Sequence, residues 1–247
     1  MTIQSKSDLQ GMRAVGKLVA EALTVMRGAA RAGMTTEQLD DVGAAYLRAR
    51  GARSAPQLTY NFPGFNCISV NDGVVHGVPG PRALMPGDVV KIDVTAELDG
   101  YIADSAVTVL LAPVSTRAHN LAQCARFAFK RAVKAAGAHA RIAEVGRAVE
   151  SEVHRWKHAV IRDLCGHGVG RKLHEAPSVP NFFSPDTTGR LEEGMVIALE
   201  PIISETPTRV FEDADGWTIR TANGCRAAHH EHTIVIRGGR PEILTAA

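Results

Sequence analysis

One ten-residue phrase occurs twice in this chain, and it constrains the fold more than any other feature. Residues 84–93 read LMPGDVVKID, and residues 191–200 read LEEGMVIALE. Both copies share a leucine, a glycine, a valine and alternate aliphatic residues, and both end on a carboxylate. A phrase of this kind is typical of a strand, and its recurrence predicts that a strand-containing unit has been duplicated.

The segments around the two phrases support a duplication. Apolar residues recur at helical spacing before each phrase, and LDDVG at residues 39–43 is matched by IAEVG at residues 142–146. Two units of roughly 100 residues each favour one pseudo-symmetric domain over a solenoid, which needs several short repeats. We therefore expect a single α+β domain over residues 1–247, with halves at about 8–112 and 116–240 and central strands backed by helices.

The helix starts are predicted from capping signatures. Ser7 with Gln10 precedes the first helical stretch, and Thr35 with Gln38 precedes the second.

Composition excludes several classes of protein. The 247 residues are 45% hydrophobic with a net charge of +2, so no strong field favours nucleic acid or an anionic membrane. The first residues are polar and no run approaches the roughly 18 apolar residues that span a bilayer. The four cysteines are widely spaced and predict reduced thiols in a cytoplasmic protein.

Two aspartates are expected on one face of a hairpin. Asp99-Gly100 is a strong signal for a two-residue turn, which would pair Thr95 with Asp104. Side chains alternate along a strand, so Asp93 shares the face of Thr95 and Asp104. Two negative charges at such a short distance repel strongly unless a proton or a cation lies between them.

Further acids and histidines can join this pair. Glu200 ends the repeated strand and should lie opposite Asp93, and Glu231 lies in HHEHTIVI. In GHGVGRKLHEAP, the glycines at 168 and 170 permit a turn that brings His167 and His174 into one cleft. Four acids in a core indicate a divalent metal.

The remaining histidines near Glu231 are expected on an exposed strand end: His229, His230 and His232.

Taken together, these segments resemble the type I methionine aminopeptidases, which have the creatinase or pita-bread fold. The resemblance rests on five motifs in order: CISVNDGVVHGVP, IDVTAELDGYIADS, CGHGVGRKLHEAP, GMVIALEP and EHTIVI. The chain departs from the family pattern at Ala103 (usually Gly), His229 (commonly Gln) and Leu173 (often Phe in bacterial members). None of these departures removes a ligand of the family pattern, but Leu173 changes one wall of the expected methionine pocket.

The resemblance implies a pseudo-two-fold fold with a curved, antiparallel-rich sheet and a site that holds two divalent ions. Cobalt, manganese, iron or zinc would suit its mixed oxygen and nitrogen ligands. Asp104 and Glu231 would bridge the ions, Asp93 would complete one site, and His167 with Glu200 the other. His76 and His174 would contact substrate, and Glu200 would also move a proton. The methionine side chain would contact Phe62, Cys67 and Trp217.

The resemblance implies a monomeric cytoplasmic enzyme that removes the N-terminal methionine from peptides and from nascent chains at the ribosome, where the second residue is small. No specific nucleic acid or membrane partner is expected. Two alternatives stay open at this point: a proline-directed aminopeptidase or prolidase of the same fold, and a non-catalytic binding protein that kept the fold.

Overall fold

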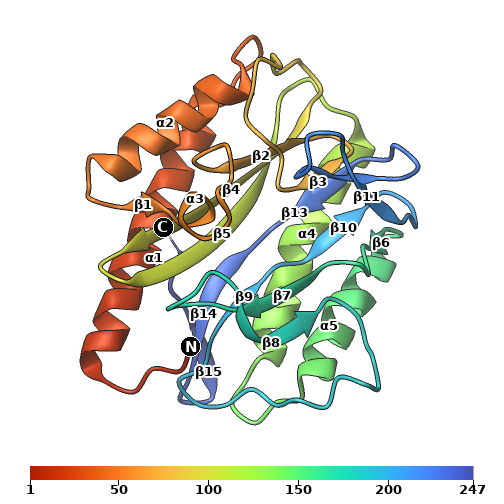
Figure 1. Cartoon of the computed structure of the whole chain (residues 1–247). Coiled ribbons are helices and arrows are strands. Elements are labelled where there is room, and N and C mark those ends of the chain that lie inside the picture. Colours follow the sequence, from red (N-terminus) through yellow and green to blue (C-terminus); the bar gives the residue numbers. More distant parts are fainter. Residues whose placement is uncertain (247) are drawn as a thin grey trace.

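The computed structural model describes residues 1–246 (Figure 1). Its helices are α1 (Lys6–Ala29), α2 (Thr36–Arg48), α3 (Ala55–Tyr60), α4 (Thr116–Ala135) and α5 (Ile142–Arg155). Its strands are β1 (Arg53–Ser54), β2 (Cys67–Val70), β3 (Gly73–Val75), β4 (Val89–Leu98), β5 (Tyr101–Leu110), β6 (Ala159–Val160), β7 (Cys165–Gly168), β8 (Glu175–Pro180), β9 (Val196–Leu199), β10 (Ile202–Ser204), β11 (Val210–Glu212), β12 (Ile219–Thr221), β13 (Ala227–His229), β14 (His232–Arg237) and β15 (Arg240–Ile243).

Capping boxes mark the starts of α1 and α2, with one correction to the sequence prediction. Thr35 and Gln38 form the predicted capping box of α2. The prediction of Ser7 and Gln10 for α1 was wrong, because the N-cap is Ser5 and the reciprocal acceptor is Asp8. The Asp8 carboxylate accepts from the Ser5 backbone N–H, so the helix starts two residues earlier.

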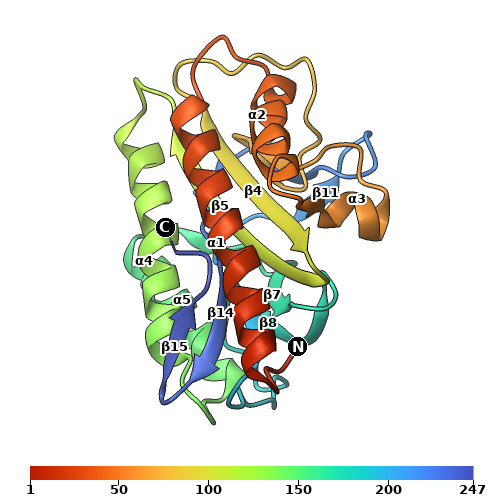
Figure 2. The same ribbon diagram turned by 90° about the vertical axis from the view of Figure 1, so that its left-hand side faces the viewer.

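The four longer helices form two pairs, each packed on its own hydrophobic core. Helices α1 and α2 cover a cluster that includes Met12, Leu39 and Ile92, and helices α4 and α5 cover a cluster that includes Leu121 and Ile197. Figure 2 shows α1 and α4 running alongside one another on the same side of the strands. No helix within residues 1–246 has both the length and the apolar character needed to cross a membrane.

The strands from the two halves meet in the middle of the molecule. Strand β4 pairs with β5 along its whole length, and its other edge pairs with β1 and β2. In the second half, a five-stranded sheet has the order β15-β14-β9-β7-β8, and a three-stranded sheet has the order β13-β10-β6. Backbone hydrogen bonds in both directions between Ala106 and Glu231 join β5 to the segment before β14. The acid-bearing strands of both halves are therefore adjacent.

Candidate metal centre and side-chain pocket

The β4–β5 hairpin positions two aspartates. Asp99 and Gly100 form its two-residue turn with φ values of 52° and 79°, and Thr95 is the register partner of Asp104. This confirms the register predicted from the sequence. The Thr95 hydroxyl donates to Asp104 Oδ1 at 2.7 Å, which fixes one carboxylate oxygen and leaves the other facing the cavity that Asp93 also lines.

The second half brings its acids to the same place through Thr233. The Asp104 backbone N–H donates to Thr233 Oγ1 at 2.9 Å, and that hydroxyl donates to the Asp104 carbonyl at 2.8 Å. These bonds hold β5 against β14, beside Glu231. Glu200 follows directly after β9, which pairs with both β14 and β7.

His167 on β7 is oriented for coordination. Its Nδ1 lies 2.9 Å from the Gly168 carbonyl, an arrangement that leaves Nε2 free for a ligand. Nε2 lies 3.3 Å from Glu200 Oε1 and 4.0 Å from Asp104 Oδ2. Asp104, His167 and Glu231 each offer one donor atom, and these three atoms lie within 4.8 Å of one another. The five predicted ligands therefore converge, all lining one cavity of about 210 Å³.

The chemistry of this cluster fits divalent metal. Burial, with the neighbouring carboxylates, raises the pKa of Asp93 and of Glu231 well above their usual range, and burial and Asp104 do the same for Glu200. Asp93 Oδ1 and Glu231 Oε1 are buried without a hydrogen-bond partner among residues 1–246. Carboxylates this crowded need a proton or a cation, and a divalent ion neutralises several of them at once.

Two further histidines border the metal centre. The rings of His167 and His174 lie 4.2 Å apart between centroids, so the glycine-rich turn does bring both into one cleft. Burial, and then His167, lower the pKa of His174 to about 4, so its imidazole is neutral near pH 7. His76 adopts a left-handed backbone with φ of 55°, which is strained for a residue other than glycine.

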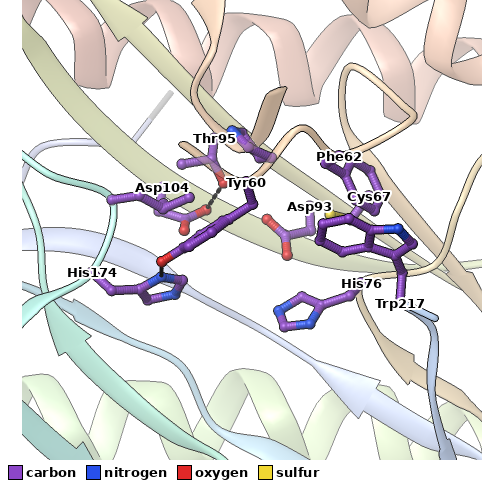
Figure 3. Close-up of a pocket in the computed structure, with 11 residues that line it drawn as sticks. Tyr60, Phe62, Cys67, His76, Asp93, Thr95, Asp104, His174 and Trp217 are labelled. Carbon is purple, nitrogen blue, oxygen red and sulfur yellow. Dashed lines mark hydrogen bonds between the residues drawn. The ribbon is translucent and has the colours of Figure 1, made fainter. Parts of the chain in front are cut away.

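Tyr60 is a neighbour of His174 that the sequence did not indicate. The hydroxyl of Tyr60, at the end of α3, lies 2.6 Å from His174 Nδ1 (Figure 3). The two residues are far apart in the chain and no local pattern connects them. This contact orients the His174 ring, which lines the cavity of the acids.

A second, largely apolar cavity of about 80 Å³ opens beside the acids. The three predicted pocket residues, Phe62, Cys67 and Trp217, line it together with Leu173. Phe62 and Trp217 meet edge to face with centroids 5.2 Å apart. The two cavities share four lining residues, which are His76, Asp93, Asp104 and His174. A substrate side chain in the apolar cavity would therefore present its backbone to the cavity of the acids.

The prediction that the histidines around Glu231 lie on an exposed strand end was wrong. His229 is only 2% exposed, and its Nε2 lies 3.3 Å from Glu231 Oε2. His230 and His232 are half-buried against Phe129, with ring centroids 5.4 and 4.8 Å away. Alternation along the chain places residues 229 and 231 on one face, but the burial of either face depends on contacts with distant segments.

Fold and site together define a metalloenzyme whose metal centre opens onto an apolar side-chain pocket. The family model for metallopeptidase family M24 matches residues 10–238, and this chain belongs to that family. It is 42% identical over 247 residues to methionine aminopeptidase 2 of Bacillus subtilis, covering 99% of each chain.

Solved structures agree with this assignment. The methionine aminopeptidase of Thermotoga maritima superposes with a TM-score of 0.96 at 35% identity, covering 100% of both chains. The prolidase of Pyrococcus furiosus superposes with a TM-score of 0.79 at 19% identity, covering 66% of that chain, and so shares the fold. The fold is therefore the predicted α+β pita-bread fold.

Proposed function

We propose that this chain is a methionine aminopeptidase, which hydrolyses the first peptide bond of peptides and nascent proteins whose second residue is small. The observation that carries this proposal is the junction of the two cavities. A methionine side chain in the apolar cavity would present its amine and its peptide bond to the acids and histidines that the cavities share. The full-length similarity to methionine aminopeptidases supports the same function.

The metal centre would be built from residues of both halves. Asp104 and Glu231 would bridge two divalent ions, Asp93 would complete one site, and His167 with Glu200 the other. Bound ions of this kind polarise the scissile carbonyl and acidify a water molecule to hydroxide near neutral pH. Their identity would depend on availability among manganese, iron, cobalt and zinc.

The other side chains bind the substrate and move protons. The neutral His174 imidazole would donate to the oxygen on which negative charge develops, with Tyr60 holding its ring. His76 would contact the scissile amide nitrogen. A carboxylate oxygen of Glu200 would take a proton from the attacking water and pass it to the leaving amine.

The methionine pocket would be formed by Phe62, Cys67 and Trp217. One residue would be removed at a time, because the free amine and the first peptide bond would both have to reach the acids and histidines at the junction of the two cavities. In a bacterium, the formyl group would have to be removed first to expose the amine.

We also propose that the domain is an internal duplication of residues 8–112 and 116–240. The two repeated phrases lead into β4 and β9, and each half contributes one helix pair. We propose a monomer that works in the cytoplasm and acts on nascent chains at the ribosome. All four cysteines are free thiols in the described part of the chain, which suits that compartment.

The test of the function is release of free methionine. The protein loaded with Mn²⁺ or Co²⁺ should cleave Met-Ala-Ser, should leave Met-Leu-Ser largely intact, and should not cleave an Xaa-Pro peptide. Asp104→Ala should abolish cleavage and reduce bound metal, because this residue would serve both ions. Preferential cleavage of the Xaa-Pro peptide would replace the proposal with a proline-directed activity, and a protein that binds no metal would refute both.

A further inference from the structure

His229 is a buried imidazole that the proposed mechanism does not use. It ends β13, where its backbone is fixed by Thr108: the His229 N–H donates to the Thr108 hydroxyl at 2.9 Å, and that hydroxyl donates to the His229 carbonyl at 2.8 Å. Its side chain points into the acidic cavity. Neither ring nitrogen has a hydrogen-bond partner within residues 1–246.

We propose that His229 is an additional metal ligand, which binds through Nε2 to the ion that Asp93 and Glu231 also hold. This inference rests on the proposed metal centre and adds a sixth ligand residue to it. Asp93, His229 and Glu231 each supply one donor atom, and the three atoms lie within 4.8 Å of one another. They form a second potential ligand group beside the one of Asp104, His167 and Glu231, and the two groups share Glu231.

The distances around His229 match those between ligands of one ion. Donors at about 2.0–2.2 Å from a tetrahedral or octahedral ion lie about 3–3.5 Å from each other. His229 Nε2 lies 3.3 Å from Glu231 Oε2, the same separation that His167 Nε2 has from Glu200 Oε1. His229 Nε2 is also 3.8 Å from Glu200 Oε2, so the ring stands between two carboxylates.

A purely structural role does not account for these features. Buried polar groups are nearly always hydrogen-bonded, because burial without a partner costs free energy. His232 follows this rule, since its Nδ1 lies 3.0 Å from Thr245 Oγ1 and its ring packs on Phe129. His229 has acids as neighbours and no hydrogen bond within residues 1–246, which is the environment expected of a metal ligand.

The consequence is a change in the character of one ion site. Without His229 that ion would be bound by carboxylate oxygens, which suit hard ions such as manganese. An imidazole nitrogen shifts preference toward iron, cobalt or zinc. The chain would then supply one histidine to each ion, His167 to one and His229 to the other.

The test is a direct count of metal–nitrogen bonds. The protein is labelled with ¹⁵N-histidine, and the full chain is loaded with ¹¹³Cd²⁺. One-bond ¹¹³Cd–¹⁵N couplings should appear for two imidazoles on two different cadmium ions. His229→Gln should lose one coupling and keep that of His167. Calorimetry should show that one of the two ions binds more weakly to His229→Gln than to the wild-type protein. The affinity should fall by at least roughly 10–100-fold, which is the loss typical when a group hydrogen-bonded to a metal ligand is removed.

His230→Gln is the matched control. Its side chain faces Phe129 on α4, so both couplings and both affinities should be retained. A wild-type spectrum with two bound cadmium ions and a coupling from His167 alone would overturn the proposal and leave the metallopeptidase function intact. The wild-type spectrum decides this without any variant, so a His229→Gln protein that fails to fold would not remove the test. Absence of bound cadmium at His167 as well would instead refute the metal centre of the proposed function.

Discussion

Gly77 has no room for a side chain, and its replacement by alanine tests the role of the neighbouring His76. A Cβ at this position would lie 2.3 Å from the Ile68 carbonyl oxygen, whereas ordinary contacts begin near 3.4 Å. The segment would have to move by about 1 Å. Two hydrogen bonds oppose this movement, because Gly77 N–H donates to Ser69 Oγ and Gly77 O accepts from Ile68 N–H, both at 2.9 Å.

The expected result is loss of catalysis without loss of metal. A misplacement of about 1 Å can cost about 10²-fold in rate, so kcat for Met-Ala-Ser should fall by roughly that factor in Gly77→Ala. Overpacking should lower the free energy of unfolding by about 1–3 kcal/mol. Bound metal should stay at the wild-type level, because none of the proposed ligands lies on this segment.

Gly80→Ala provides the matched control on the same loop. A Cβ there meets nothing within 4 Å, so kcat and stability should be close to wild type. Methionine release, metal analysis and thermal unfolding are measured on all three proteins. A Gly77→Ala enzyme with normal kcat would refute the positioning of His76, and one that loses metal would show that the segment supports the metal centre instead.

Three further predictions concern the pocket, the oxyanion donor and the metals. Leu173→Phe should raise the preference for Met-Ala-Ser over norleucine-Ala-Ser by up to roughly tenfold, because a sulfur–aromatic contact is worth about 0.3–1.5 kcal/mol; an unchanged ratio of kcat/KM values would refute this. His174→Ala should keep its metal while kcat falls by roughly 10²–10³-fold, and metal loss would show that the residue is misassigned. Chelation should abolish activity and lower the free energy of unfolding by about 2.7 kcal/mol for each ion that is bound at a free metal concentration of 100 Kd, and an unchanged melting temperature would contradict metal ions that stabilise the fold.

The hairpin could be predicted because its determinants are local. Asp99 and Gly100 both adopt the positive φ values that a two-residue turn requires, and such a turn fixes the register of every residue beside it. The pairing of Thr95 with Asp104 follows directly. The convergence of Asp104 with Glu231 could not be derived from either strand alone, and was expected from the number of buried acids and from the family resemblance.

His229 and Tyr60 were missed because tertiary packing decides their environment. A run of histidines beside an acid has the composition of an exposed strand end. Its actual burial depends on Phe129 of α4 on one face and on the acids of both halves on the other. Tyr60 belongs to the six-residue helix α3, and its contact with His174 joins segments 114 residues apart.

The most direct test of the metal centre is anomalous scattering from a crystal soaked with Mn²⁺. We expect anomalous peaks within coordination distance of Asp104, His167 and Glu231, in the cavity next to the apolar pocket. Ordered carboxylates with no anomalous peak among them, at a metal concentration that supports methionine release, would contradict it.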